Sequence, residues 1–174
     1  MPTVIIDAGH GGSDFGATYE GRLEKDDNLN LALAVGDILA ANGINVLYTR
    51  TTDIYETPTA KAMEGNASGA DYFISIHRNS SPIPKQYTGI ESLVYNRNST
   101  AGNIAENINR NLESIGFANQ GVNERKNLAV LRRTTMPAVL VEAGFINNPS
   151  DNTLFDARFD EIAQAIADGI LESI

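Results

Sequence analysis

The chain contains two histidines, and each one follows an apolar run that is typical of a buried strand. His10 comes after residues 4–8, His77 comes after residues 72–76, and a third run over 138–141 ends in Glu142. The ends of strands hold side chains rigidly and leave them open on one side, so several strand ends at one sheet edge form a site. Two imidazoles in such positions could share one ion, which raises the hypothesis of a metal centre.

The chain has no cysteine, which excludes disulfides and thiolate ligands and leaves imidazole and carboxylate groups for a transition metal. Zinc in hydrolases commonly takes three ligands from His, Asp and Glu and keeps a fourth position for water. His10 and His77 supply two ligands, and composition does not choose the third among 22 acidic residues. Glu24 ends the loop that starts at His10, but with Asp26 and Asp27 it would also favour a helix start. The residues alone leave both roles open.

Glu142 ends a run that is apolar enough for a central strand. A carboxylate there is costly to bury unless it is paired or catalytic. Beside a metal it would be placed to take the proton of a water while the ion polarises a scissile carbonyl. The alternative is a buried ion pair with Arg132 or Arg133.

The glycine-rich segment 9–16 follows a predicted strand and invites comparison with nucleotide-binding loops. Asp14 stands where the dinucleotide pattern requires its third glycine, and its charge would repel a pyrophosphate. Ala17 and Thr18 replace the Lys-Ser/Thr pair of a phosphate loop. The glycines are better explained as permissive backbone that turns sharply and brings His10 into a crowded site, with an ordinary surface turn as the alternative.

Composition narrows the class of protein. The 174 residues are enough for one domain with its own core, so we expect a single domain over 1–174. A net charge of -9 disfavours binding to a nucleic-acid backbone. No run reaches the roughly 18 to 20 apolar residues of a membrane span, and residues 1–3 lead straight into a strand. We therefore expect no membrane span and no signal peptide in this chain.

The sequence alternates between β-rich runs and helical patterns, as a layered α/β domain does. Apolar spacing or cap residues predict helices over about 29–40, 57–68, 104–115 and 159–170, and a shorter one that starts at 148–149. The fold class expected is a single three-layer domain with a twisted, mostly parallel but mixed sheet of about six strands and helices on both faces. The expected strands are residues 3–8, 45–50, 72–77, 89–95, 128–131 and 138–142. The irregular segments 9–25 and 78–88 each follow a histidine, and we expect them to build the walls of the site.

Six short motifs in fixed order resemble those of the zinc-dependent N-acetylmuramoyl-L-alanine amidases of the amidase type 3 family. The likeness runs essentially end to end, and the ordered set is specific although each motif alone is weak. The motifs are IDAGHGG at 6–12, EKDDNL at 24–29, TRTTD at 49–53, SIHRN at 75–79, GIE at 89–91 and PAVLVEAGFINN at 137–148.

This resemblance implies zinc ligands at His10, Glu24 and His77 and a catalytic carboxylate at Glu142. It also implies the substrate, the amide between N-acetylmuramic acid and the L-alanine of the stem peptide in peptidoglycan. Water activated by zinc and deprotonated by Glu142 would attack that carbonyl, and the same carboxylate would return the proton to the leaving amine.

Two features of this chain differ from the family's usual pattern, and at these positions the resemblance does not assign a function. Arg78 stands where the family usually has a small residue, and it would either bind a stem-peptide carboxylate or pair with a neighbouring acid. Arg78 and Asn79 are therefore candidate substrate contacts. The helix over 57–69 lacks the family's usual basic pattern, so no function is expected from it.

The resemblance also sets the expected biological setting. The chain would act outside the membrane on the bacterial wall, as a monomeric catalytic domain that can be joined to wall-binding modules. An autolysin, a sporulation or germination enzyme and a phage lysin all fit. Rival hypotheses are a zinc peptidase that cuts within the stem peptide and a catalytically inactive wall-binding module.

Overall fold

Six strands form one twisted sheet at the centre of the molecule, in the order β4-β1-β5-β8-β6-β7. The computed structural model describes all 174 residues. Only the β6·β8 pair is antiparallel, so the mixed, mostly parallel sheet that the sequence predicts is confirmed. A separate two-stranded hairpin, β2 (Thr18–Tyr19) and β3 (Arg22–Leu23), stands outside it. The sheet strands are β1 (Thr3–Ala8), β4 (Asn45–Tyr48), β5 (Tyr72–Asn79), β6 (Ile90–Val94), β7 (Asn119–Glu124) and β8 (Ala138–Phe145).

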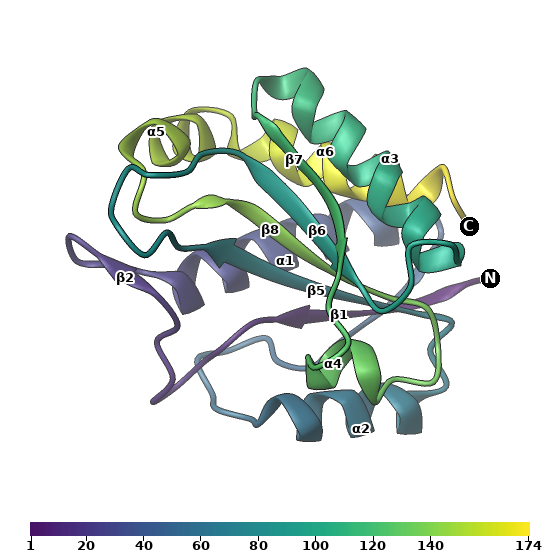
Figure 1. Ribbon diagram of the computed structural model, residues 1–174. Helices are drawn as coiled ribbons and strands as arrows, with labels where there is room; N and C mark the ends of the chain where they lie inside the picture. Colours follow the sequence, from purple (N-terminus) through teal and green to yellow (C-terminus); the bar gives the residue numbers. More distant parts are fainter.

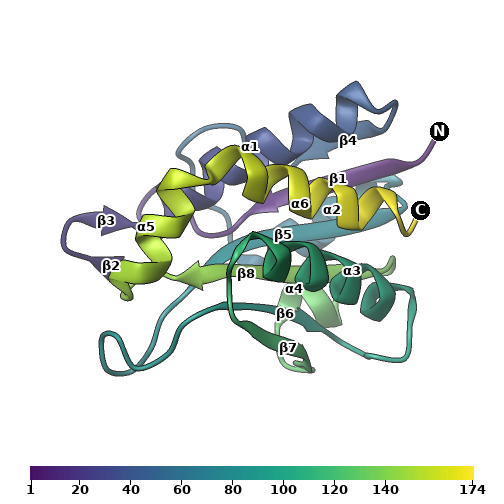
Figure 2. The same cartoon turned by 90° about the horizontal axis from the view of Figure 1, so that it is seen from above.

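Helices lie on both faces of the sheet, which confirms the three-layer architecture (Figures 1 and 2). The helices over one face are α1 (Glu24–Ala41), α3 (Thr100–Ile115) and α6 (Phe159–Leu171), with α5 (Pro149–Ala157) at their end. The other face carries only α2 (Pro58–Ser68) and α4 (Ala129–Arg132). The caps of α2 and α5 form as their residues predict, because the Thr57 and Asn148 side chains accept hydrogen bonds from backbone N–H groups of the first turn.

The two faces differ greatly in how much core they bury. A cluster of 28 buried residues fills the space between the sheet and α1, α3 and α6. The cluster under α2 and α4 has only 8 residues, among them Ile5, Phe73 and Leu140. Because α4 is a single turn, this second layer leaves the carboxyl ends of β1, β5 and β8 uncovered on its side, and these ends point to the left in Figure 1.

Two element predictions are wrong. Residues 128–131 were expected to form a strand, but 129–132 are the helix α4, which buries Val130 and Leu131 against the small core. The missing sixth strand is β7, whose sequence NQGVNE carries no apolar alternation. β7 pairs only with β6 and buries a single side chain, Val122, so an edge strand formed without the pattern that marks a buried one.

Candidate active site

His10, Glu24 and His77 converge at the uncovered end of the sheet. His10 follows β1, His77 lies on β5, and Glu24 is the first residue of α1. One ligand atom from each residue lies within 4.8 Å of the other two. His10 Nε2 is 3.3 Å from Glu24 Oε1, and His77 Nδ1 is 3.1 Å from Glu24 Oε2. The three residues that the sequence suggested as ligands are therefore neighbours in space.

The donor set fits a zinc ion. It consists of two imidazoles and one carboxylate, which is one of the ligand combinations that zinc hydrolases use. Glu24 is 3% exposed, and its carboxylate faces the two imidazoles with no lysine or arginine pairing it. Its oxygens accept hydrogen bonds from the Ala17 and Arg78 N–H groups and from the Asn28 amide, and the positive charge that a buried carboxylate also needs would come from protonated imidazoles or from a divalent cation. The cluster could therefore hold a metal ion.

The first turn of the loop after β1 is shaped around the two histidines. His10 has φ 62°, in the left-handed region. A Cβ atom at Gly9 would lie 2.3 Å from the His77 ring, so only glycine fits against that imidazole. At Gly16, with φ 67°, a Cβ would lie 2.6 Å from the His10 ring. The glycines are thus explained by close packing against the two imidazole rings in a crowded site, and not by an ordinary surface turn.

Asp14 orients His10 from the side opposite Glu24. Its Oδ2 atom is 2.8 Å from His10 Nδ1, and its Oδ1 atom accepts a hydrogen bond of 3.0 Å from the Gly16 N–H. A carboxylate at Nδ1 favours the tautomer with the proton there, which leaves the lone pair of Nε2 facing Glu24. From the sequence, Asp14 was interpreted only as an obstacle to phosphate, although it stands just four residues after His10.

Three buried side chains hold the backbone that carries His10. The Lys61 ammonium donates to the carbonyl groups of Ala8 at 2.8 Å and His10 at 3.2 Å. Arg50 donates to Ala8 and Gly9, and the Asn28 amide donates to Gly9 at 3.0 Å. Every carbonyl group of residues 8–10 therefore has a side-chain donor.

Lys61 is in turn fixed by a buried carboxylate, Asp7. Asp7 is 1% exposed and lies 2.9 Å from the Lys61 ammonium. The hydroxyl groups of Thr49 and Ser75 also donate to it, at 2.8 and 2.7 Å. Burial raises the pKa of Asp7, but the charges of Lys61 and His77 and the hydrogen bonds from Ser75 and Lys61 outweigh it, and the pKa lies below its usual value.

This network is not predicted from the sequence, which led us to expect no function from the helix that carries Lys61. A signal for it was present in residues 4–8, because Asp7 is a carboxylate inside an apolar strand, as Glu142 is. Although α2 lacks the family's usual pattern of basic residues, it still supplies one basic residue to the site, because Lys61 donates to the His10 carbonyl group.

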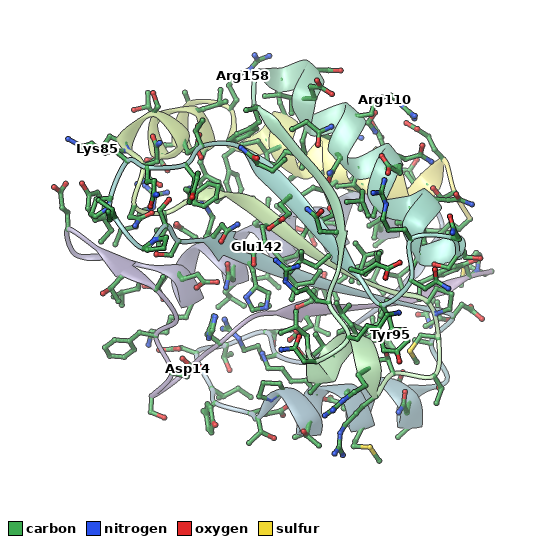
Figure 3. The ribbon with its side chains drawn as sticks, in the orientation of Figure 1. Asp14, Lys85, Tyr95, Arg110, Glu142 and Arg158 are labelled. Carbon is green, nitrogen blue, oxygen red and sulfur yellow. The ribbon has the colours of Figure 1, made fainter.

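Glu142 lies beside the cluster, in a row of polar side chains across three strands. It is in register with His77 on β5 and with Glu91 on β6, on the face that α2 and α4 leave open. Its Oε2 atom is buried and has no hydrogen-bond partner. Burial raises the pKa of Glu142 to about 7; the nearby His77 lowers it and the carboxylates of Glu24 and Glu91 raise it. Figure 3 shows Glu142 near the middle of the molecule, with Asp14 below it.

The ion pair that was the alternative role for Glu142 does not form. Arg132 and Arg133 are exposed, and no lysine or arginine lies within ion-pair distance of the Glu142 carboxylate. A part-buried carboxylate without a positive partner, with one oxygen free and a pKa near neutrality, has the properties of a general base.

The ionisable groups of the cluster shift each other's pKa values. Burial lowers the pKa of His10, but the Glu24 and Asp14 carboxylates outweigh this effect and raise it to about 9. Burial likewise lowers the pKa of His77, and Glu24 and Glu142 reverse the shift. The Glu24 pKa lies well below its usual value, because the two imidazoles outweigh the opposing effect of burial. A metal ion would therefore have to displace protons from the imidazoles.

Arg78 and Asn79 were candidate substrate contacts. The Arg78 side chain is buried on the opposite face of β5 from His77, where it donates to Asp27 and Asn152 at 2.8 Å. Its guanidinium also stacks 4.2 Å above the Phe155 ring. Pairing with a neighbouring acid is thus the arrangement observed, and the Arg78 side chain has no exposed surface to offer a substrate.

Asn79 shares the face of His77 and is part-buried. Its amide lies 3.4 Å from Glu91 Oε1, and its own oxygen accepts a hydrogen bond from the Ser80 N–H. It stays a candidate for substrate contact.

A cleft of about 440 Å³ opens beside the two histidines on the α2 and α4 side of the sheet. Its lining includes the apolar residues Leu128, Val130 and Leu140. The loops after β1 and β5 both lie at this end of the molecule (Figure 1). The first contributes Gly9, His10 and Asp14 to the lining, whereas no residue of 78–88 lines the cleft, so only the segment after β1 forms a wall as expected. Candidate metal ligands, an unpaired carboxylate and a cleft therefore lie at the same end of the sheet.

Comparison with known proteins gives a consistent result. Residues 4–172 match the Amidase_3 family model, described as N-acetylmuramoyl-L-alanine amidase. The chain is 38% identical to a sporulation-specific N-acetylmuramoyl-L-alanine amidase of Bacillus subtilis, over 98% of the chain and 67% of that protein. It is 34% identical to an endolysin of Bacillus phage SPP1, over 97% of the chain and 65% of the endolysin. The chain thus spans about two thirds of the length of these relatives.

A solved structure is similar to this chain in both fold and sequence. The crystal structure of an N-acetylmuramoyl-L-alanine amidase from Clostridium difficile 630 superposes with a TM-score of 0.92 at 34% identity. The superposition covers 98% of this chain and 95% of that one.

Proposed function

The chain belongs to the Amidase_3 family of N-acetylmuramoyl-L-alanine amidases, and we propose that it hydrolyses the amide bond between N-acetylmuramic acid and L-alanine in peptidoglycan. The observation that carries the proposal is the placement of Glu142 in register with His77, beside the His10, Glu24 and His77 cluster. This arrangement joins a possible metal site to a carboxylate with one unpaired oxygen.

We propose that His10, Glu24 and His77 hold a zinc ion. Bound there, zinc would supply Lewis acidity, which polarises an amide carbonyl and makes water more acidic. Asp14 would keep the His10 ring in the required tautomer and orientation. The hydrogen bonds from Lys61, Arg50 and Asn28 would hold the backbone of residues 8–10 still while substrate binds.

Glu142 is proposed as the general base and acid. Its carboxylate, which no lysine or arginine pairs, would take a proton from the attacking water as the C–O bond forms, and would give that proton to the amine nitrogen as the C–N bond breaks. The products are a muramic acid carboxylate and a free L-alanine amino group. A pKa near 7 suits both steps, because the group can gain and lose the proton at neutral pH.

The test is digestion of purified cell walls by the zinc-loaded protein, with identification of the new termini. New L-alanine amino groups are expected, and the muramic lactyl group should become a carboxylate. New termini within the stem peptide would instead show a peptidase. No new termini, together with binding to the wall, would show an inactive binding module. Glu142→Ala should abolish release, and a variant that digests as fast as the parent would remove Glu142 from the mechanism.

We further propose that residues 1–174 act as the catalytic domain of a wall hydrolase, monomeric and able to work beside wall-binding modules. The relatives include a sporulation amidase and a phage endolysin, and both kinds of protein act on peptidoglycan outside the cytoplasm. No helix in the structure is long and apolar enough to span a bilayer.

A further inference from the structure

The cleft beside His10 and His77 is a built feature of the fold. Its floor is the open face of the sheet, with Leu140 from β8 and the Asp7 carboxylate of β1. One wall is the first turn of α2, and the other is the segment 127–130, which leads into α4. Both helices lie below the sheet in Figure 1. The cleft thus extends from the candidate metal ligands to the space between α2 and the segment 127–130.

Away from His10 and His77, the cleft offers no free positive charge to an anionic ligand. The only lysine or arginine in its lining is Lys61. All three donors of its ammonium are already used, by Asp7 at 2.9 Å and by the carbonyl groups of Ala8 and His10 at 2.8 and 3.2 Å. Lys61 is also 3% exposed. A carboxylate bound between α2 and the segment 127–130 would therefore find no partner for its charge.

The remaining polar groups of the cleft are mainly acceptors. The carboxylates of Asp14 and Glu56 lie in its lining, and carboxylates accept hydrogen bonds from hydroxyl and amide groups. The rest of the surface is largely apolar, and Leu128, Ala129 and Val130 form one wall. This combination suits a ligand that is uncharged, carries several hydroxyl or N–H donors and has apolar faces and methyl groups.

Only one half of the proposed substrate has this chemistry. The stem peptide carries free carboxylates, whereas the sugar half is an uncharged pyranose with hydroxyl groups, an N-acetyl methyl and a lactyl methyl. We propose that the cleft binds the N-acetylmuramoyl ring, while the stem peptide leaves the reacting amide on the Glu142 side of His77. This assignment rests on the proposed amidase function. The cleft volume of about 440 Å³ lies in the range of small-ligand pockets, about 300–1,000 Å³.

The test compares two substrates with the same scissile amide. One is a soluble N-acetylmuramoyl-tripeptide, and the other is the D-lactoyl-tripeptide that lacks the sugar ring. Binding energy from a remote part of the substrate appears in kcat/KM. The readout is the muramoyl-to-lactoyl ratio, which is kcat/KM for the muramoyl substrate divided by kcat/KM for the lactoyl substrate. For the zinc-loaded protein we expect this ratio to be about 10 to 100.

Two variants fill the cleft from opposite walls. Ala129→Phe adds a ring from the α4 side, and Thr59→Phe adds one from α2. Each should lower the muramoyl-to-lactoyl ratio about 10-fold by excluding the sugar. Ala67→Phe is the matched control, since Ala67 is exposed on α2 and does not line the cleft, and it should leave the ratio unchanged.

The outcomes separate this inference from the proposed function. A wild-type ratio near one, or a ratio that neither filling variant lowers, overturns the sugar assignment while the amidase function stands. If neither substrate is cleaved, the amidase function fails, and the cleft is then tested by binding alone. In that case the N-methylamide of N-acetylmuramic acid is titrated into the protein and followed by NMR. Amide shifts over 127–130 that Ala129→Phe abolishes support the subsite, and their absence overturns it.

Discussion

The buried pair of Lys61 and Asp7 yields a prediction whose size follows from the structure. Lys61→Met keeps the apolar stem and removes the ammonium, so the Asp7 carboxylate stays buried without its cation. Removing one partner of a buried pair costs about 3–5 kcal/mol. Thr49 and Ser75 would still donate to Asp7, so we expect the lower end, about 3 kcal/mol.

Urea unfolding at neutral pH measures this loss, and the matched control is Lys126→Met. Lys126 pairs with Glu124 at 3.6 Å with both side chains exposed, and exposed pairs contribute about 0–1 kcal/mol. Combining Lys61→Met with Asp7→Asn removes the uncompensated charge. The double variant should therefore be more stable than the sum of the two single losses predicts.

The pH dependence gives a second check on the same pair. The Asp7 pKa lies below its usual value of 3.8, so the pair stabilises the fold above that pH and the benefit is lost as pH falls through the lowered pKa. The stability gap between wild type and Lys61→Met should thus narrow below about pH 4. A loss under about 1 kcal/mol at neutral pH, or strict additivity with Asp7→Asn, would show that the Asp7 carboxylate does not depend on the Lys61 cation.

Three further predictions concern the site. Glu142→Gln should lower kcat by about 10²- to 10⁴-fold, because it removes the proposed general base. The free energy of unfolding should not fall, because the substitution replaces a carboxylate that burial disfavours. A variant that unfolds at lower urea concentration than the parent would contradict this. Asp14→Asn should weaken zinc binding about 10- to 100-fold in chelator competition, and an unchanged affinity would mean that Asp14 does not orient His10. Because the pKa of His10 is raised to about 9, zinc affinity should rise with pH and level off above about 9. Calorimetry in buffers of different ionisation enthalpy should detect the release of protons when zinc binds. An affinity that does not change between pH 6 and 9 would count against the proposed ligands.

Much of the fold could be predicted because its main signals are local. Runs of apolar residues marked β1, β5 and β8, and cap residues marked the starts of α2 and α5. The failures fall where local pattern is weakest. The apolar run 128–131 is too short to distinguish a strand from one helical turn, and β7 gains its stability from pairing with β6.

The sequence by itself determined the kinds of chemistry available and the strand ends that carry them. His10, His77 and Glu142 were predictable because each directly follows or ends an apolar run. Motif order supplied Glu24 by resemblance, a choice that composition could not make. These are properties of neighbouring residues in the chain.

Only the tertiary structure decided which of these groups meet and which turn away. Strand order and register place Glu142 beside His77, and the alternation of side chains along β5 sends Arg78 to the opposite face. The contact of Lys61 with Asp7 joins residues that are 54 positions apart, through the packing of α2 on the sheet. Such contacts depend on how distant elements pack, and no local pattern encodes that packing.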